Sequence, residues 1–213
     1  MPRDTLSREK VLDAALRLAD QHGLGALSMR KLAAELGVEA MSLYNHVANK
    51  ADLLDGVAGR VFEAIALPDP ALSWEERLRA LAGGAFAAFA AHPEVVRALA
   101  ADHANPRSAG SLRFIDALLA ALLDSGIDER AAARRYRSLF GLLYGSVLVR
   151  SVDLTGSGSS SAEPIDEWFK RSVTAAQLPS LARALPALLE LDCGPTFAEE
   201  LEFYLDGMRA ALD

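Results

Sequence analysis

LSMRKLAAELGVEAMSLYNHV, residues 27–47, contains two short helical segments and the turn between them. Ser28 is expected to cap a helix that runs through Leu36, and a second helix is expected over about Ala40–Val47. Gly37 stands between them, where a tight turn requires a positive φ that glycine adopts without strain. Two helices joined in this way form a DNA-binding helix-turn-helix when the second helix is free to enter a major groove.

The two sides of this motif differ in chemistry. Ala33 is small where the two helices must approach closely, and the inward face is apolar: Leu32, Leu36, Val38, Leu43 and Val47. The outward face of the second helix carries Ala40, Met41, Ser42, Tyr44, Asn45 and His46. These are more hydrogen-bonding groups than a purely structural helix requires, and Arg30 stands in the first turn of the helix before it. The alternative is a three-helix packing unit that does not touch DNA.

Each polar residue of the motif also has a simpler interpretation. Tyr44 would pack partly against the first helix of the chain, since tyrosine is often half-buried with a wet hydroxyl. His46 would satisfy free carbonyls at a helix C-terminus. Arg30 would pair with Glu35 or Glu39, although surface ion pairs are weak and would yield to phosphate or guanine.

The remaining sequence predicts an all-α chain. Its composition is rich in Ala, Leu, Glu and Arg, and no alternating strand pattern occurs. Helices are expected at about 7–22, 50–66, 73–92, 94–104, 107–124 and 128–152, then after Pro164, after Pro179, and from Thr196 to near the C-terminus. Ser73 and Thr196 each open an S/T-x-x-E capping box, and 156–161 is a flexible Gly/Ser loop. We expect a DNA-binding head (1–48), a connector helix (49–66) and a larger helical body (67–213), to which a family resemblance assigns ligand binding and dimerisation.

Charge and composition limit the classes of protein. The net charge is −7, but residues 1–60 hold equal numbers of basic and acidic side chains, so residues 61–213 carry the whole excess. An acidic body with a neutral head still permits local phosphate binding. The single cysteine, Cys193, excludes an intramolecular disulfide, and no apolar run approaches a membrane span. A cytoplasmic protein without membrane contact is expected.

The segments GLGALSMRKLAAELGV and SLYNHVANKADLLD resemble the DNA-binding head of the tetracycline-repressor (TetR) family. The family's L-Y-x-H-V-x-N-K run stands here as Leu43–Lys50. The C-terminal part is similar to the tetracycline-repressor-type core in its Ser-Trp start, its proline-punctuated segment and its last helix. The resemblance implies a homodimeric transcriptional regulator, most simply a repressor. It would bind a palindromic operator in double-stranded DNA and be released by a small-molecule effector.

The same resemblance assigns roles to residues. Arg30 would read a guanine, and Ala40, Met41 and Ser42 occupy the base-contacting positions. Tyr44, His46 and Lys50 would contact the backbone or the groove edge, with Asn45 beside them. The sequence departs from tetracycline repressors at Met29, Ala40, Met41 and Asn45, so a different operator is expected.

The body offers aromatic residues for a ligand site. Most aromatic residues at helical spacing are core, but a pocket between helices is lined by the same residue types. The candidates for the lining are Phe86, Phe89, His103, Phe114, Phe140 and Tyr144, and Trp168 and Phe169 are candidates to close over a ligand. Gly141 and Gly145 leave a flat strip for another helix, which the resemblance assigns to the dimer bundle. Tetracycline repressors hold the magnesium-tetracycline complex with histidines and a glutamate. The corresponding stretch here, residues 61–65, contains no histidine, which argues against tetracycline as the effector.

No catalytic motif is present. The chain lacks H-E-x-x-H, G-x-S-x-G, a P-loop and G-x-G-x-x-G, and its four histidines form no i, i+4 pair. We therefore expect no enzyme, no cofactor and no metal site. The competing function is a helical small-molecule-binding or protein-interaction module whose head does not engage DNA, and the sequence leaves repressor and activator both open.

Overall fold

The computed structural model describes residues 6–101, 103–105, 107–151, 163, 165–190 and 193–212. These residues form helices joined by turns and no strand, which confirms the all-α class. The elements are α1 Arg8–His22, the 3₁₀ helix η1 Leu24–Ala26, α2 Met29–Leu36, α3 Ala40–Leu43, α4 Lys50–Glu63, α5 Trp74–Ala91, α6 Pro93–Ala100, α7 Ala109–Leu123, α8 Glu129–Ser151, α9 Ile165–Ser172, α10 Pro179–Glu190 and α11 Cys193–Arg209.

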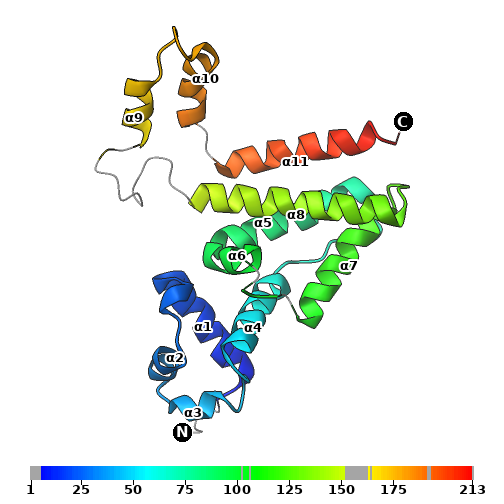
Figure 1. Cartoon of the computed structure of the whole chain (residues 1–213). Helices are drawn as coiled ribbons and strands as arrows, with labels where there is room; N and C mark the ends of the chain where they lie inside the picture. Colours follow the sequence, from blue (N-terminus) through cyan, green and yellow to red (C-terminus); the bar gives the residue numbers. More distant parts are fainter. Residues whose placement is uncertain are drawn as a thin grey trace.

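The helices form a head, a body and an arm (Figure 1). The short helices α2 and α3 lie with α1 at one end of the molecule, and α4 runs from them into the body. In the body, α8 lies beside α11 and packs on α5, α6 and α7. The pair α9 and α10 rises away from the body as an arm. The DNA-facing and ligand-facing candidates therefore stand in different parts of one continuous helical structure.

Short polar residues begin the helices as the sequence indicates. The side chains of Ser7, Ser28 and Asn49 accept hydrogen bonds from backbone N–H groups three residues later. Ser73 and Glu76 form the predicted capping box at the start of α5. These caps fix where α1, α2, α4 and α5 begin, and so where their buried faces point.

The core is continuous from head to body because α4 belongs to both. Leu53 and Val57 on α4 are buried, and α4 packs against α1 on one side and against α7 on the other. Phe62, near the C-terminal end of α4, is buried among the aromatic residues of the body. A displacement of α4 would therefore change packing in both the head and the body.

Three helices end earlier than the sequence predicts. The helix expected over residues 40–47 ends at Leu43, because the next three N–H groups bond to carbonyls three residues back and form turns. The helix expected to reach residue 104 ends at Ala100, since the N–H groups of His103 and Ala104 both bond to the carbonyl of Ala98. Helix α4 ends at residue 63 rather than 66, with a turn from Ile65 to Phe62.

The last helix begins at Cys193, so the capping box predicted at Thr196 is wrong. The Gly/Ser loop predicted at 156–161 lies outside the described residues.

Candidate DNA interface and ligand site

The turn between α2 and α3 has the geometry that the sequence indicates. Gly37 adopts the left-handed conformation, with φ 65° and ψ 32°. The N–H of Val38 donates to the carbonyl of Ala33 at 3.0 Å, which closes the C-terminus of α2. Leu43 and Val47 are buried on the inner side. The inward half of the motif therefore fixes α3 against the rest of the head and leaves its other side free.

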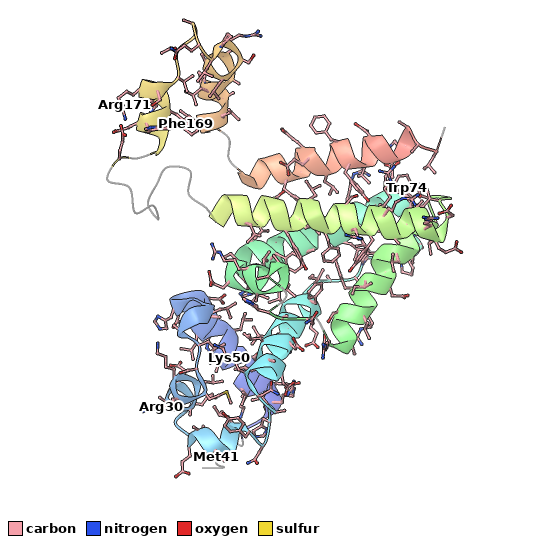
Figure 2. The ribbon with its side chains drawn as sticks, in the orientation of Figure 1. Arg30, Met41, Lys50, Trp74, Phe169 and Arg171 are labelled. Carbon is pink, nitrogen blue, oxygen red and sulfur yellow. The ribbon has the colours of Figure 1, made fainter. Side chains whose placement is uncertain are left out.

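The outer side of α3 and of the following turn is exposed. Met41 is 73% exposed and Tyr44 47% exposed. Asn45 is also exposed, whereas Ala40, Ser42 and His46 are half-buried. An exposure of 47% leaves about half of the Tyr44 side chain covered, which is compatible with the partial packing considered from the sequence. We call Ala40–Ser42, Tyr44–His46, Arg30 and Lys50 together the α3 surface; Figure 2 shows Met41 at the end of the head furthest from the body.

Both cations of this surface are free to bind a partner. Arg30 and Lys50 are exposed, and no ion pair involves either of them within the described part of the chain. The alternative pairing of Arg30 with Glu35 or Glu39 does not form there. An unpaired guanidinium carries donors in a planar fork that suits guanine or phosphate.

Arg8 and Asp52 connect α4 to the recognition turn, a link that the sequence analysis missed. The Arg8 guanidinium donates two hydrogen bonds to the Asp52 carboxylate, at 3.1 and 2.7 Å, and a third to the carbonyl oxygen of His46 at 2.6 Å. Asp52 also accepts from the N–H of Ala48 at 2.7 Å. The bonds from Arg8 and from this N–H lower the pKa of Asp52. The start of α4 is thereby attached to the chain that follows α3.

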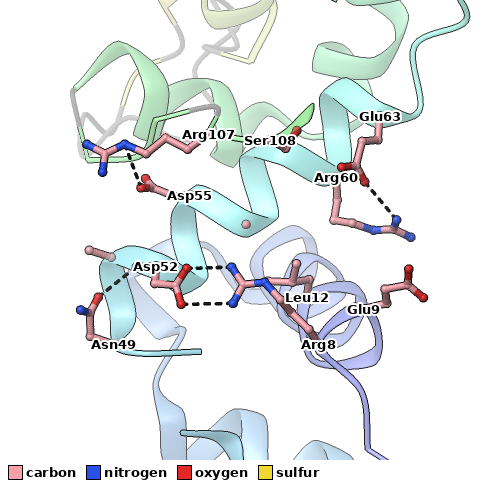
Figure 3. Close-up of a pocket in the computed structure, with 12 residues that line it drawn as sticks. Arg8, Glu9, Leu12, Asn49, Asp52, Asp55, Arg60, Glu63, Arg107 and Ser108 are labelled. Carbon is pink, nitrogen blue, oxygen red and sulfur yellow. Dashed lines mark hydrogen bonds and ion pairs between the residues drawn. The ribbon is translucent and has the colours of Figure 1, made fainter. Parts of the chain in front are cut away.

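The other side of α4 is attached to the body. Asp55 accepts a hydrogen bond from the N–H of Asn105 at 2.7 Å and lies 3.6 Å from Arg107. A Cβ on Gly59 would come within 2.9 Å of Ser108, so the two segments approach closely because this residue is glycine. The residues between these contacts line a polar pocket of about 620 Å³ (Figure 3). Its charged groups are largely paired with one another, so ion pairs connect the segments that line the pocket.

A second joint links the head to α6. Glu94 accepts a hydrogen bond from the N–H of Leu24 at 3.1 Å, and His92 Nδ1 lies 3.0 Å from both carboxylate oxygens of Asp20. Because Leu24 and Asp20 belong to the head, the start of α6 contacts the head as α4 does.

The body contains a cluster of aromatic rings drawn from four helices. Phe62 of α4 lies 5.3 Å from Phe89 of α5 and 5.6 Å from Phe114 of α7, measured between ring centroids. From α8, Phe140 lies 5.5 Å from Tyr144 and 4.7 Å from Tyr136, and it also contacts rings from α4 and α7. We call these six residues the aromatic cluster. Its α8 side is half-buried, and its other side is closed.

Four of the six predicted ligand-site residues belong to the cluster: Phe89, Phe114, Phe140 and Tyr144. Phe86 does not, because it stacks on Phe197 of α11 at 4.2 Å. His103 is exposed and lines a small pocket beside η1 and the start of α4. Phe62 also belongs to the cluster, although its position in the sequence assigns it to the connector helix. Trp168 and Phe169 contact each other on the arm.

Two phenols of the cluster lack a hydrogen-bond partner among the described residues. The hydroxyls of Tyr136 and Tyr144 accept and donate nothing there, whereas that of Tyr204 donates to the carbonyl of Arg135 at 2.9 Å. Burial raises the pKa of Tyr136 and of Tyr144, so both remain protonated donors at neutral pH. They are the polar groups that a bound molecule would meet beside the four phenylalanine rings.

Helices α8 and α11 carry an open strip of glycines. A Cβ at Gly141, Gly145 or Gly207 would meet nothing within 4 Å. Phe203, on α11, is 76% exposed. Among the described residues, nothing packs closely against Gly141 or Gly145, so the strip is open to another helix.

The described ranges hold no group of three or more histidine, cysteine or acidic side chains placed to bind a metal. No helix within them is long and apolar enough to span a bilayer.

Family models match almost the whole chain. Residues 11–57 match the model described as bacterial regulatory proteins of the tetR family, and residues 67–212 match the tetracyclin repressor-like C-terminal domain.

Individual relatives agree with these matches. An HTH-type transcriptional regulator of Saccharopolyspora erythraea is 33% identical over 189 residues, which cover 85% of this chain and 76% of the relative. The HTH-type transcriptional repressor DrrR1 of Streptomyces coeruleorubidus is 40% identical over 94 residues, 43% of this chain and only 35% of the repressor. The crystal structure of the TetR family protein ActR of Streptomyces coelicolor, in complex with (S)-DNPA, superposes with a TM-score of 0.82 at 27% identity. That match covers 98% of this chain and 100% of ActR.

Proposed function

The chain belongs to the TetR family of bacterial regulators, and from this premise we propose that it is a ligand-released repressor that binds a palindromic operator as a homodimer. The observation that carries the proposal is the α3 surface. Its two cations are exposed and make no ion pair within the described residues, and Tyr44 and Asn45 are exposed beside them, while the inner side of the same motif is buried. DNA is the partner that such a surface fits, because phosphates bind the cations and base edges bind the side chains of α3.

Dimerisation supplies the second half of the operator contact. Two recognition helices related by a two-fold axis reach successive major grooves when they stand about 34–36 Å apart. The glycine strip on α8 and α11, with the exposed Phe203 beside it, supports a helix-to-helix contact between two copies. We assign residues 1–48 to DNA binding, 49–66 to the connection and 67–213 to ligand binding and dimerisation.

We place the effector against the aromatic cluster. ActR was crystallised with a small molecule, and the cluster here offers flat apolar rings beside two unpartnered hydroxyls. Phe62 links this site to the head, since it lies on the same helix as Asp52, which Arg8 joins to the carbonyl of His46. A molecule that binds better when α4 is displaced would weaken DNA binding by its difference in affinity for the two states. The role is regulatory rather than catalytic, and its place is the cytoplasm.

Selection from a random DNA pool tests the proposal. Purified full-length protein should enrich duplexes that share one inverted repeat, and adding a molecule that quenches the fluorescence of the aromatic cluster should release them. Enrichment of no common sequence would instead favour the rival function, a small-molecule-binding or interaction module whose head does not engage DNA.

A further inference from the structure

Met41 is the more exposed of the two large apolar side chains on the α3 surface, at 73% against 47% for Tyr44. By contrast, Leu43, two residues after Met41, is fully buried. A single exposed methionine is ordinary on a protein surface. Its position is what matters, because α3 is the helix proposed to enter the major groove and Met41 lies at the far end of the head (Figure 2).

The first turn of α3 has little free hydrogen-bonding capacity. Ala40 carries no polar side-chain atom. The hydroxyl of Ser42 donates to the carbonyl oxygen of Glu39 at 2.6 Å, so its proton is already used. The part of α3 that would meet base edges first is therefore apolar.

The major groove offers one prominent apolar group to such a side chain. Guanine, adenine and cytosine present hydrogen-bond donors and acceptors there, whereas thymine adds a C5-methyl group. Covering that methyl and the methionine side chain together removes apolar surface of both from water.

We propose that Met41 determines operator specificity by packing against the C5-methyl of one thymine in each half-site. This assignment rests on the proposed function, because it requires α3 to lie in the groove. It separates the roles on the α3 surface: Arg30 uses its donors for guanine or phosphate, and Met41 selects a T·A pair by shape and apolar contact.

Deoxyuridine substitution tests this directly, since uracil lacks only the methyl group of thymine. In the selected operator, each thymine is replaced symmetrically in both half-sites, and the dissociation constant of the full-length protein is measured by fluorescence anisotropy. One position should weaken wild-type binding about fourfold per half-site, which corresponds to about 0.8 kcal/mol for one buried methyl group. Met41→Ala should bind the thymine and uracil operators equally.

Two matched variants complete the experiment. Met41→Leu keeps an apolar side chain and should retain most of the preference for thymine, and Arg113→Ala, on α7 in the body, should keep it fully. Sensitivity to no thymine, or the same sensitivity in Met41→Ala as in wild type, would overturn the assignment while leaving the regulator function standing. Failure to select any operator would overturn both.

Discussion

The α3 surface and the aromatic cluster are assembled in opposite ways. The side chains of the α3 surface come from one segment, Arg30–Lys50, and are exposed or half-buried. The aromatic cluster takes its rings from four helices between Phe62 and Tyr144, and three of the six rings are fully buried. A rigid duplex can be met only by an exposed surface, whereas a small molecule must be enclosed.

Substitutions in the two regions should therefore affect different quantities, DNA affinity in one and stability in the other. Side chains of the α3 surface contribute little to the core, so their loss should change DNA affinity alone. Side chains of the cluster hold the body together, so their loss should change stability first.

The largest effect is expected for Phe114→Ala. Its side chain is 1% exposed and contacts two other rings, and truncating a buried phenylalanine typically costs about 3–5 kcal/mol of stability. Chemical denaturation of this variant beside Met41→Ala measures the contrast. Similar losses in both variants would mean that α3 is structural and would break the comparison.

Arg30→Ala should be next in size, on DNA affinity instead of stability. The loss of a bidentate contact to guanine costs about 1–3 kcal/mol and relaxes specificity at that base pair. Anisotropy with the selected operator and with operators changed at one position measures this. Arg113→Ala, which removes another exposed arginine from α7 in the body, is the control and should leave the affinity unchanged.

Two tyrosine variants sharpen the account of the cluster. Tyr204→Phe loses the hydrogen bond to the carbonyl of Arg135 and should lower stability by about 1 kcal/mol. Tyr144→Phe loses no hydrogen bond within the described residues and should leave stability unchanged or slightly higher. Thermal unfolding compares the two. A larger loss in Tyr144→Phe would show that its hydroxyl serves the fold rather than a ligand.

The smallest effect concerns pH and lies outside both sites. Glu75 accepts hydrogen bonds from Arg209 and Arg79, and the bonds from Arg209 contribute most to lowering its pKa from 4.5 to about 2. A depressed carboxyl pKa stabilises the fold above the ordinary value and loses that contribution as the pH falls from about 4.5 towards 2. Wild type should therefore be more stable than Glu75→Gln at pH 7, and the difference should shrink by pH 3. A constant difference in unfolding temperature would contradict this pairing.

The sequence predicts the head well because the head is local. Ser28, Gly37 and the apolar spacing lie within twenty residues, and cap, turn and buried face each follow from nearest neighbours along the chain. Even there, the end of α3 at Leu43 depends on three-residue turns that the spacing does not reveal.

The cluster could be predicted only in part, because periodicity identifies apolar faces but not which faces meet. Phe86 and Phe89 are both buried on α5, yet the first stacks on Phe197 and the second meets Phe62 edge to face. His103 lies outside the cluster, because α6 ends at Ala100 and His103 follows in an exposed bend. The link between Arg8 and Asp52 joins residues 44 positions apart, and no local pattern indicates it.

The salt dependence of operator binding tests the central claim most directly. Anisotropy titrations of wild type and Lys50→Ala at several salt concentrations yield the slope of log affinity against log salt, and the saturation point yields the stoichiometry. Wild type should bind as two protomers per operator. Its affinity should fall steeply as the salt concentration rises, because binding releases counterions from the DNA. Lys50→Ala should reduce the slope by about 2, one phosphate contact from each protomer. Binding that is weak, indifferent to sequence and unchanged by Lys50→Ala would contradict the account and leave the head a structural unit.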